Sequence, residues 1–598
     1  MGIPTRNVLC AALYLAIASS LAAQQELSRD QAALAIVHVT VIDATGAPAH
    51  PGCSVIVLGD RIAALGADKQ IAVPPKAHVV DGTGKFLIPG LWDMHVHLDY
   101  KDYLPLFIAN GVTGVRVMWG EPEHHAWRKD IEAGNLLGPR MKIASPIIDG
   151  PKPYWSSSIS VATEEQARQA VAMSKRYGAD FVKVYQFLPR ELYFAIADEA
   201  KKEGIPFEGH LPVTVTAEEG SRAGQKSFEH LVGVLPASST RSAELFQTAQ
   251  ADFAAIQSKG KFEGLHDWLL GRAMLDTYSP EKVAALSTVF KSNGTWQCPT
   301  LVLLRMFAYG NDPSFLADPR LHYMPPAMKK SWDPSKLEGD RTPQDFVYSR
   351  KEFARDLEVV GDMEKSGVGI LAGTDSQNPY TFYGFSLHDE LGLLVQAGLS
   401  PMRALQAATL NPALFFGQEK EFGTVEQGKI ADLVLLSANP LEAIDNTKKI
   451  EAVIYGGKLY ERAALDMMLA KAAALAARPL ISEVLFNTIQ ANGIDAAVKQ
   501  YRELKATRPD AYDFSENEFI RLGYQLLHQK RFKESIEIFK LSVEAYPDSY
   551  NTYDSLGEAY MDDGDKYLAI QNYEQSLQLK PGNHNGVEML KKLQAPAP

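Results

Sequence analysis

The segment Leu87–Tyr100, LIPGLWDMHVHLDY, contains two histidines that are two residues apart. In a β-strand, side chains at positions i and i+2 point to the same face, so the imidazoles of His95 and His97 are expected side by side. Two such nitrogens can bind one metal ion. The pair alone does not establish a metal site, because two incidental histidines fit the same pattern.

Three further strand-like segments end in a residue that can bind a metal. These are PFEGH (206–210), ending in His210; KSFEH (226–230), ending in His230; and VGILAGTD (368–375), ending in Asp375. The active sites of (β/α)8 barrels are built at the carboxyl ends of the strands. The sequence therefore predicts that four histidines and one aspartate converge there.

Strand and helix patterns alternate over residues 86–415. A helix is predicted from a capping box at Thr163 and Gln166 to Gly178, and the short apolar strand FVKVY (181–185) follows it. This alternation favours an α/β fold with a parallel sheet, most simply a (β/α)8 TIM-like barrel. The mostly helical segment at about 240–292 is too long for one connection, so we interpret it as an insertion or lid.

Two strand-rich segments flank this block, at residues 24–85 and 416–465. Both contain short apolar stretches that are bounded by glycine and other turn residues. Because the segments are far apart in sequence and each is small, we expect them to form one composite β-domain.

The C-terminal segment, residues 480–598, is predicted to be all-α and repetitive. Gly523 recurs at Gly557 and Pro547 recurs at Pro581, and both spacings are 34 residues. This is the period of the tetratricopeptide repeat, in which small residues let helices pack closely. Such a domain can bind a protein partner or mediate self-association.

The first residues indicate export. Arg6 precedes the apolar run VLCAALYLAIASSLAA, which is short for a membrane span and typical of a signal peptide over residues 1–23. We therefore expect an exported protein, periplasmic or extracellular, with no membrane span after cleavage. Cys53 and Cys298 then remain, and two buried thiols are favoured over a disulfide.

The composition excludes several classes of protein. Of the 598 residues, 46% are hydrophobic and 22% are charged, as in ordinary globular proteins. The net charge is −12, so the chain lacks the basic surplus of a nucleic-acid-binding protein.

Lys183 lies inside the apolar strand FVKVY, where a lone charged amine would be costly. One interpretation is a lysine paired with an acid. The other is a neutral amine that has captured carbon dioxide, because a lysine carbamate is anionic and its two oxygens can bridge two cations.

Eight segments together resemble the amidohydrolase superfamily, in its secreted imidazolonepropionase-like and prolidase-like branch. They are PGLWDMHVH, NGVTGVR, GADFVKVY, IPFEGH, AGQKSFEHL, GILAGTDS, ALQAATLNPALFFG and GTVEQGKIADLVLL. The resemblance implies a metal-dependent barrel that carries a small β-sandwich domain. It also implies two divalent metal ions, with zinc as the default.

The resemblance assigns the ligands residue by residue. His95, His97 and Asp375 would hold one metal, His210 and His230 the other, and carbamylated Lys183 would bridge them. A metal-bridging hydroxide would attack an amide or peptide-like carbonyl–nitrogen bond, with Asp375 as the proton shuttle. Dipeptides and N-acyl amino acids are the expected small-molecule substrates.

Three residues are weaker candidates for binding substrate: Tyr185, His388 and Arg116. Tyr185 shares a strand face with Lys183, His388 follows the last predicted strand, and Arg116 could bind a carboxylate or form a structural ion pair. Two alternative functions remain open. One is a lactonase or esterase with the same binuclear site, and the other is a repeat-based interaction protein with a degenerate barrel.

Overall fold

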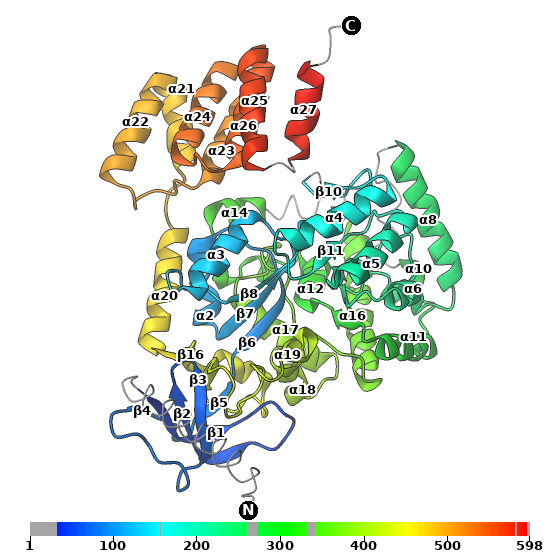
Figure 1. Ribbon diagram of the computed structural model, residues 1–598, viewed down its shortest axis with the longest axis vertical. Coiled ribbons are helices and arrows are strands. Elements are labelled where there is room, and N and C mark those ends of the chain that lie inside the picture. The colour runs from blue at the N-terminus through cyan, green and yellow to red at the C-terminus, as the bar shows by residue number, and fades with distance from the viewer. Residues whose placement is uncertain (1–32, 156, 260–271, 333–340, 581–582, 595–598) are drawn as a thin grey trace, which may run out of the picture.

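The computed structural model describes residues 33–155, 157–259, 272–332, 341–580 and 583–594. A β-rich region lies at one end of the molecule, a region of alternating strands and helices in the centre, and a helical arm at the other end (Figure 1). The predicted signal peptide, residues 1–23, lies outside the described residues.

The central region is organised around parallel strands. Its first sheet contains β6 (Leu91–Val96), β7 (Val112–Val117) and β8 (Arg140–Ile143), and its second contains β9 (Ile148–Asp149), β10 (Ile159–Ser160), β11 (Val182–Val184), β12 (Phe207–Gly209), β13 (Ser227–Glu229) and β14 (Trp296–Cys298). All pairings within both sheets are parallel. This is the arrangement that alternating strands and helices favour.

Isolated bridges connect the two sheets in a ring. A parallel bridge from Ala144 to Phe181 joins the end of β8 to the start of β11. Two more place the segment 370–376 between β14 and β6, because Ile370 pairs with Gln297 and Ser376 with Val96. The order of pairing therefore returns to β6, as closure into a barrel requires.

Helices follow most of these strands along the chain. They include α2 (Pro105–Ala109), α3 (Pro122–Glu132), α4 (Glu164–Arg176), α5 (Arg190–Glu203), α6 (Ala217–Arg222), α11 (Pro280–Asn293), α16 (Pro343–Lys365), α17 (Phe385–Gln396), α18 (Pro401–Ala407) and α19 (Leu410–Phe416). The structure confirms Thr163 as the N-cap of α4, since its side chain accepts a hydrogen bond from the Gln166 amide. The predicted capping box is incomplete, because the Gln166 side chain accepts from the Ala162 amide instead of from that of Thr163. The helix buries one apolar stripe, as an amphipathic helix does.

Only part of the segment predicted as an insertion, about 240–292, is inserted between the alternating strands and helices. It contains α8 (Ser242–Lys259), α10 (Arg272–Leu275) and α11, while residues 260–271 lie outside the described part. Because α11 packs against α6 and leads into β14, it serves as a barrel helix. A second excursion, not anticipated from the sequence, contains α12 (Leu301–Tyr309), α13 (Pro313–Leu316), η2 (Pro319–Tyr323) and α14 (Pro326–Ser331).

The β-rich region combines strands from both sides of the central region. Its sheet has the order β17-β16-β15-β5-β1-β2-β3, with β4 paired to β1. These strands are β1 (Leu34–Val41), β2 (His50–Leu58), β3 (Arg61–Ala67), β4 (His78–Asp81), β5 (Phe86–Pro89), β15 (Leu433–Leu436), β16 (Ile450–Tyr455) and β17 (Lys458–Glu461). The antiparallel pairing of β5 with β15 joins the two sequence segments. Cys53 in this sheet and Cys298 in β14 are buried free thiols, as predicted.

The arm is a series of antiparallel helix pairs. After α20 (Arg462–Ala476) come α21 (Ile481–Asn492) and α22 (Ile494–Thr507), α23 (Glu516–His528) and α24 (Phe532–Ala545), α25 (Tyr550–Asp563) and α26 (Lys566–Leu579), and α27 (His584–Gln594). Gly523 and Gly557 sit at equivalent positions, facing Phe539 and Tyr573 of the next helix. The arm also contacts the barrel, since Lys580 Nζ lies 2.9 Å from Glu121 Oε2.

None of the helices in the described ranges combines the length and hydropathy that a bilayer span requires.

Replacing Gly523 with Ala should loosen the arm. The added Cβ would lie 2.4 Å from the Phe539 ring, and overpacking of this kind costs about 1–3 kcal/mol. The gain in helix propensity offsets about 1 kcal/mol of that cost. We expect faster hydrogen exchange of amides in α23 and α24.

Gly557→Ala is the matched control, because its nearest contact would be 3.2 Å and the propensity gain should dominate. Equal protection of α23 and α24 in the wild-type and Gly523→Ala proteins would contradict the predicted overpacking.

Candidate metal centre

The residues that the sequence placed at strand ends do converge. Asp375 Oδ1 lies 3.2 Å from His95 Nε2 and 2.9 Å from His97 Nε2, and Asp375 Oδ2 lies 3.7 Å from His230 Nε2. The His210 ring lies beside His230, with 4.8 Å between ring centroids. Residues from β6, β12, β13 and the 370–376 segment thus meet at one end of the ring of strands.

The other ring nitrogens of these histidines contact neighbouring polar groups. The Nδ1 atom of His95 lies 2.8 Å from Glu229 Oε2, and that of His230 lies 2.6 Å from Thr300 Oγ1. The Nδ1 atom of His210 lies 3.4 Å from Gln186 Oε1. Metal-binding histidines are oriented in this way, because a partner on one nitrogen aims the other at the ion.

Two observations show that this donor set fits a divalent cation. The buried atoms His95 Nε2 and Asp375 Oδ1 have no hydrogen-bond partner among the described residues, although such atoms are costly to leave unpaired. Burial lowers the pKa of His97, lowers that of His230 to about 3, and holds that of His210 well below its usual range. The imidazoles of His97, His210 and His230 therefore favour the neutral form, which is the form that binds metal.

Asp375 is ionised in this environment. Burial acts to raise the pKa of its carboxyl group, but the His95 and His230 rings beside it hold the pKa well below its usual value. A carboxylate among imidazoles suits zinc and related divalent ions.

Lys183 projects into the same site from β11. Its side chain is buried, and its Nζ has no hydrogen-bond partner within the described ranges. Burial lowers the pKa of this amine to about 8, with Glu229 and Asp375 acting in the opposite direction. A substantial neutral fraction near pH 7–8 is what carbamate formation requires.

Glu229 supports the site from below and was not singled out from the sequence. Its carboxylate contacts His95 on one side and accepts hydrogen bonds from Arg116 Nη2 at 2.9 and 3.0 Å on the other. Burial acts to raise the Glu229 pKa, but Arg116 holds it below the usual range. The sequence feature that could have identified Glu229 is its position directly before His230. Because successive side chains of a strand point to opposite faces, Glu229 is turned away from His230.

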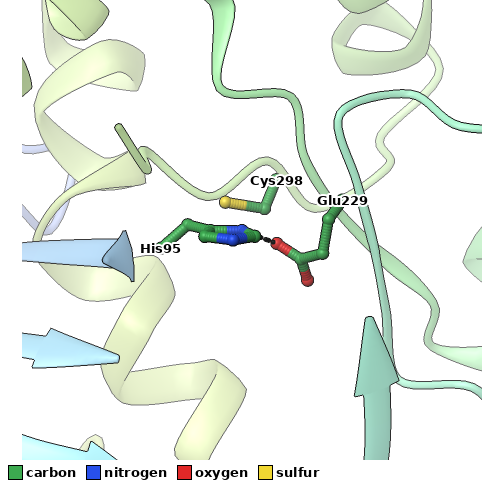
Figure 2. Close-up of side chains that lie close together, drawn as sticks. All are labelled: His95, Glu229 and Cys298. Carbon is green, nitrogen blue, oxygen red and sulfur yellow. Dashed lines mark hydrogen bonds and ion pairs between the residues drawn. The ribbon is translucent and has the colours of Figure 1, made fainter. Parts of the chain in front are cut away.

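Figure 2 shows a second group of potential ligands, formed by His95, Glu229 and Cys298. These residues form the support layer rather than another metal site. Glu229 already carries a guanidinium partner, and burial raises the Cys298 pKa well above its usual value, so the sulfur stays a thiol. Metal binding needs the thiolate.

The backbone is strained where the ligands are presented. His230 and Asp375 have φ values of 58° and 53°, and Thr300, which contacts His230, has 49°. Non-glycine residues rarely adopt this left-handed region, and such strain clusters at functional sites.

A cavity of about 930 Å3 opens over these residues. Tyr185 lines it, stacks on the His210 ring at 4.1 Å between centroids, and accepts a hydrogen bond from Trp155 Nε1. Trp119, Tyr154 and Trp155 extend this aromatic wall. The position of Tyr185 is consistent with contact to a bound substrate.

The suggested substrate roles of Arg116 and His388 do not fit the structure. Arg116 is fully buried beneath the ligands, where it pairs with Glu208 and Glu229, so it forms the structural ion pair that was the alternative. His388 is buried in α17, with its ring nitrogens 2.9 Å from Thr447 Oγ1 and 3.0 Å from the Asn110 carbonyl oxygen. Helix α17 turns this side chain toward the β-rich region and away from the cavity.

Comparisons with known proteins agree with this geometry. The amidohydrolase family model matches residues 86–460, and the tetratricopeptide repeat model matches residues 550–583. An adenine deaminase from Paracoccus denitrificans is 21% identical over 66% of this chain and 53% of its own length. An imidazolonepropionase from Symbiobacterium thermophilum is 55% identical over 12% of this chain and 18% of its own length.

This chain matches only part of the length of these curated relatives. For an adenine deaminase from Rubrobacter xylanophilus, the match covers 17% of that protein. Among solved structures, bottromycin amidohydrolase has a TM-score of 0.58 at 22% identity, covering 76% of this chain and 93% of that chain. A Xaa-Pro dipeptidase has a TM-score of 0.52 at 20% identity, covering 72% and 100%. These likenesses show the fold, and the family match over residues 86–460, which is more than half of the chain, shows that the chain belongs to the amidohydrolase family.

Proposed function

We propose that this protein is a metal-dependent hydrolase that cleaves a carbon–nitrogen bond in a small amide, such as a dipeptide or an N-acyl amino acid. The observation that carries the proposal is the convergence of His95, His97 and Asp375, in which the Asp375 carboxylate lies against both imidazoles and, with His97, lines a cavity. The names of the similar proteins, which include adenine deaminase, imidazolonepropionase and Xaa-Pro dipeptidase, all refer to chemistry at such bonds.

The donor set suits two zinc ions. His95, His97 and Asp375 would hold one ion, His210 and His230 the other, and a carbamate on Lys183 would join them. The neutral fraction of the buried Lys183 amine supports this, since only a neutral amine adds carbon dioxide. A closed (β/α)8 barrel and a β-sandwich form of the β-rich region belong to the same proposal.

When bound, the metal supplies Lewis acidity, which polarises a carbonyl group and makes water a better nucleophile at neutral pH. The chain's own residues then handle the proton. Asp375 Oδ1 lies against His95 and His97, whereas Oδ2 lies 3.7 Å from His230 Nε2, so Oδ2 is the oxygen that would accept a proton from the attacking water. The same carboxyl group can return this proton to the leaving nitrogen.

The surroundings position the substrate. The Trp155 indole fixes the Tyr185 ring, which covers His210 and forms one wall of the cavity. Glu229 and Arg116 hold His95 from below, so the ligand geometry does not depend on the substrate.

Two features outside the site belong to the proposal. The N-terminal segment predicts export to the periplasm or the medium. The tetratricopeptide arm would dock a protein partner or a second copy of the chain, as such repeats commonly do.

Asp375→Asn should abolish turnover because the amide cannot accept the proton. We expect a loss of about 100- to 10,000-fold in kcat, the usual contribution of a general acid–base. Metal content should fall much less than activity. The exposed Asp130→Asn change on α3 is the control, and full activity of the Asp375→Asn protein would refute the shuttle role.

Lys183→Ala should remove the bridge. We expect metal content, measured by mass spectrometry, to fall from two ions per chain to one or fewer, with loss of activity. The exposed Lys129→Ala change is the control. In the wild-type protein, exchange into 13C-bicarbonate should give a carbamate 13C signal that Lys183→Ala lacks. Two retained metals in that variant would exclude the bridge.

Chelation should destabilise the barrel as well as inactivate it. A ligand at 100 times its Kd stabilises the folded state by about 2.7 kcal/mol. Removal of the metals should therefore lower Tm measurably, and added zinc should restore both Tm and activity. An identical Tm before and after chelation would argue against a resident metal.

A further inference from the structure

The cavity over the metal centre also extends between two helices outside the ring of strands. Leu303 and Phe307 of α12 line it, together with Ser349, Glu352 and Asp356 of α16. These helices lie in the chain between β14 and the last parallel segment, and they pack against each other. This part of the cavity contains none of the residues assigned to metal binding.

The face of α16 toward this cavity has an unusual composition. Ser349, Glu352, Phe353 and Asp356 follow the spacing i, i+3, i+4, i+7, which brings them onto one face of the helix. Such an inward face is normally apolar. Here it carries two carboxyl groups one helical turn apart, where like charges repel each other.

Among the residues that the structure describes, neither of the two carboxyl groups forms an ion pair. Asp356 is only 6% exposed, and within the described ranges neither it nor Glu352 makes a hydrogen bond or an ion pair. Arg341 is close enough to affect Glu352, but its guanidinium donates to the Phe307 carbonyl and to Ser349 Oγ. Burial raises the pKa of Glu352 to about 9 and that of Asp356 to about 7.

A pair of carboxyl groups, of which Asp356 is buried and Glu352 partly buried, lines this cavity and forms no ion pair within the described ranges. We infer that the substrate carries an ammonium or guanidinium group, which binds between Glu352 and Asp356 while its scissile carbonyl lies at the metal centre. This inference rests on the proposed function and specifies its substrate class. The Phe307 and Phe353 rings line the same compartment and can contact a cation through their faces.

The size of the cavity agrees with this assignment. Its volume of about 930 Å3 is near the upper end for small-molecule sites, which usually enclose about 300–1,000 Å3. A cavity of this size, lined by Asp375 at the strand ends and by Glu352 and Asp356 of α16, accommodates an amide with a long basic side chain. The substrate class is thus an amide of lysine, arginine or a similar basic amine.

The test compares arginine with citrulline, which has the same shape and no charge. Dipeptides and N-acetyl amino acids that contain one or the other are assayed with the wild-type protein. We expect kcat/KM to be about 10- to 100-fold higher for arginine, as for a charged hydrogen bond. In the double variant Glu352→Gln/Asp356→Asn, kcat/KM for arginine compounds should fall to that for citrulline compounds, so that the preference is lost.

Glu358→Gln removes one negative charge from the exposed face of the same helix and should keep the wild-type preference. Calorimetry in two buffers gives a second measurement, with the inactive Asp375→Asn protein and an arginine dipeptide. Near pH 7.5, binding should release a proton from the carboxyl pair, and this release should vanish when Glu352 and Asp356 are also replaced.

The outcomes separate the two proposals. Hydrolysis of arginine and citrulline compounds at equal rates would overturn the cation site and leave the amide hydrolase in place. A preference for arginine that survives in the double variant would also overturn it. No hydrolysis of any amide by the metal-loaded protein would instead overturn the proposed function.

Discussion

A guanidinium buried completely inside the ring of strands organises the site above it. Arg116 pairs with Glu208 and Glu229, and Glu229 in turn contacts His95. Removing one member would leave a buried charge without its partner, which typically costs about 3–5 kcal/mol. The His95 orientation is therefore coupled to an interaction that spans β6, β7, β12 and β13.

This support explains how a cluster of imidazoles and one carboxylate is kept in place. In His95, His210 and His230, the Nδ1 atom faces away from the candidate metal centre and contacts a polar side chain. The strained backbone at His230 and Asp375 presents these two ligands at strand ends. The scaffold pre-organises the donors, so binding a metal does not require the chain to rearrange first.

The excursions of the chain decide what surrounds the metal centre. Helices α12 and α16 add a second compartment to the cavity, and the arm contacts a residue that lines it through the Lys580–Glu121 pair. The barrel thus provides the chemistry, whereas loops and added helices provide the space that a substrate must fit.

The sequence by itself determined the residue types at the strand ends, the 34-residue repeat and the family. Strand alternation and repeat spacing are local patterns, so they can be recognised in the sequence without knowledge of the fold. The tertiary structure decided the rest. Whether His388 faces the cavity or Thr447 depends on how α17 packs, and the partner of Arg116 lies more than 90 residues away in the chain. The enclosure of Glu352 and Asp356 likewise depends on the packing of α12 against α16, because burial is a property of the whole fold.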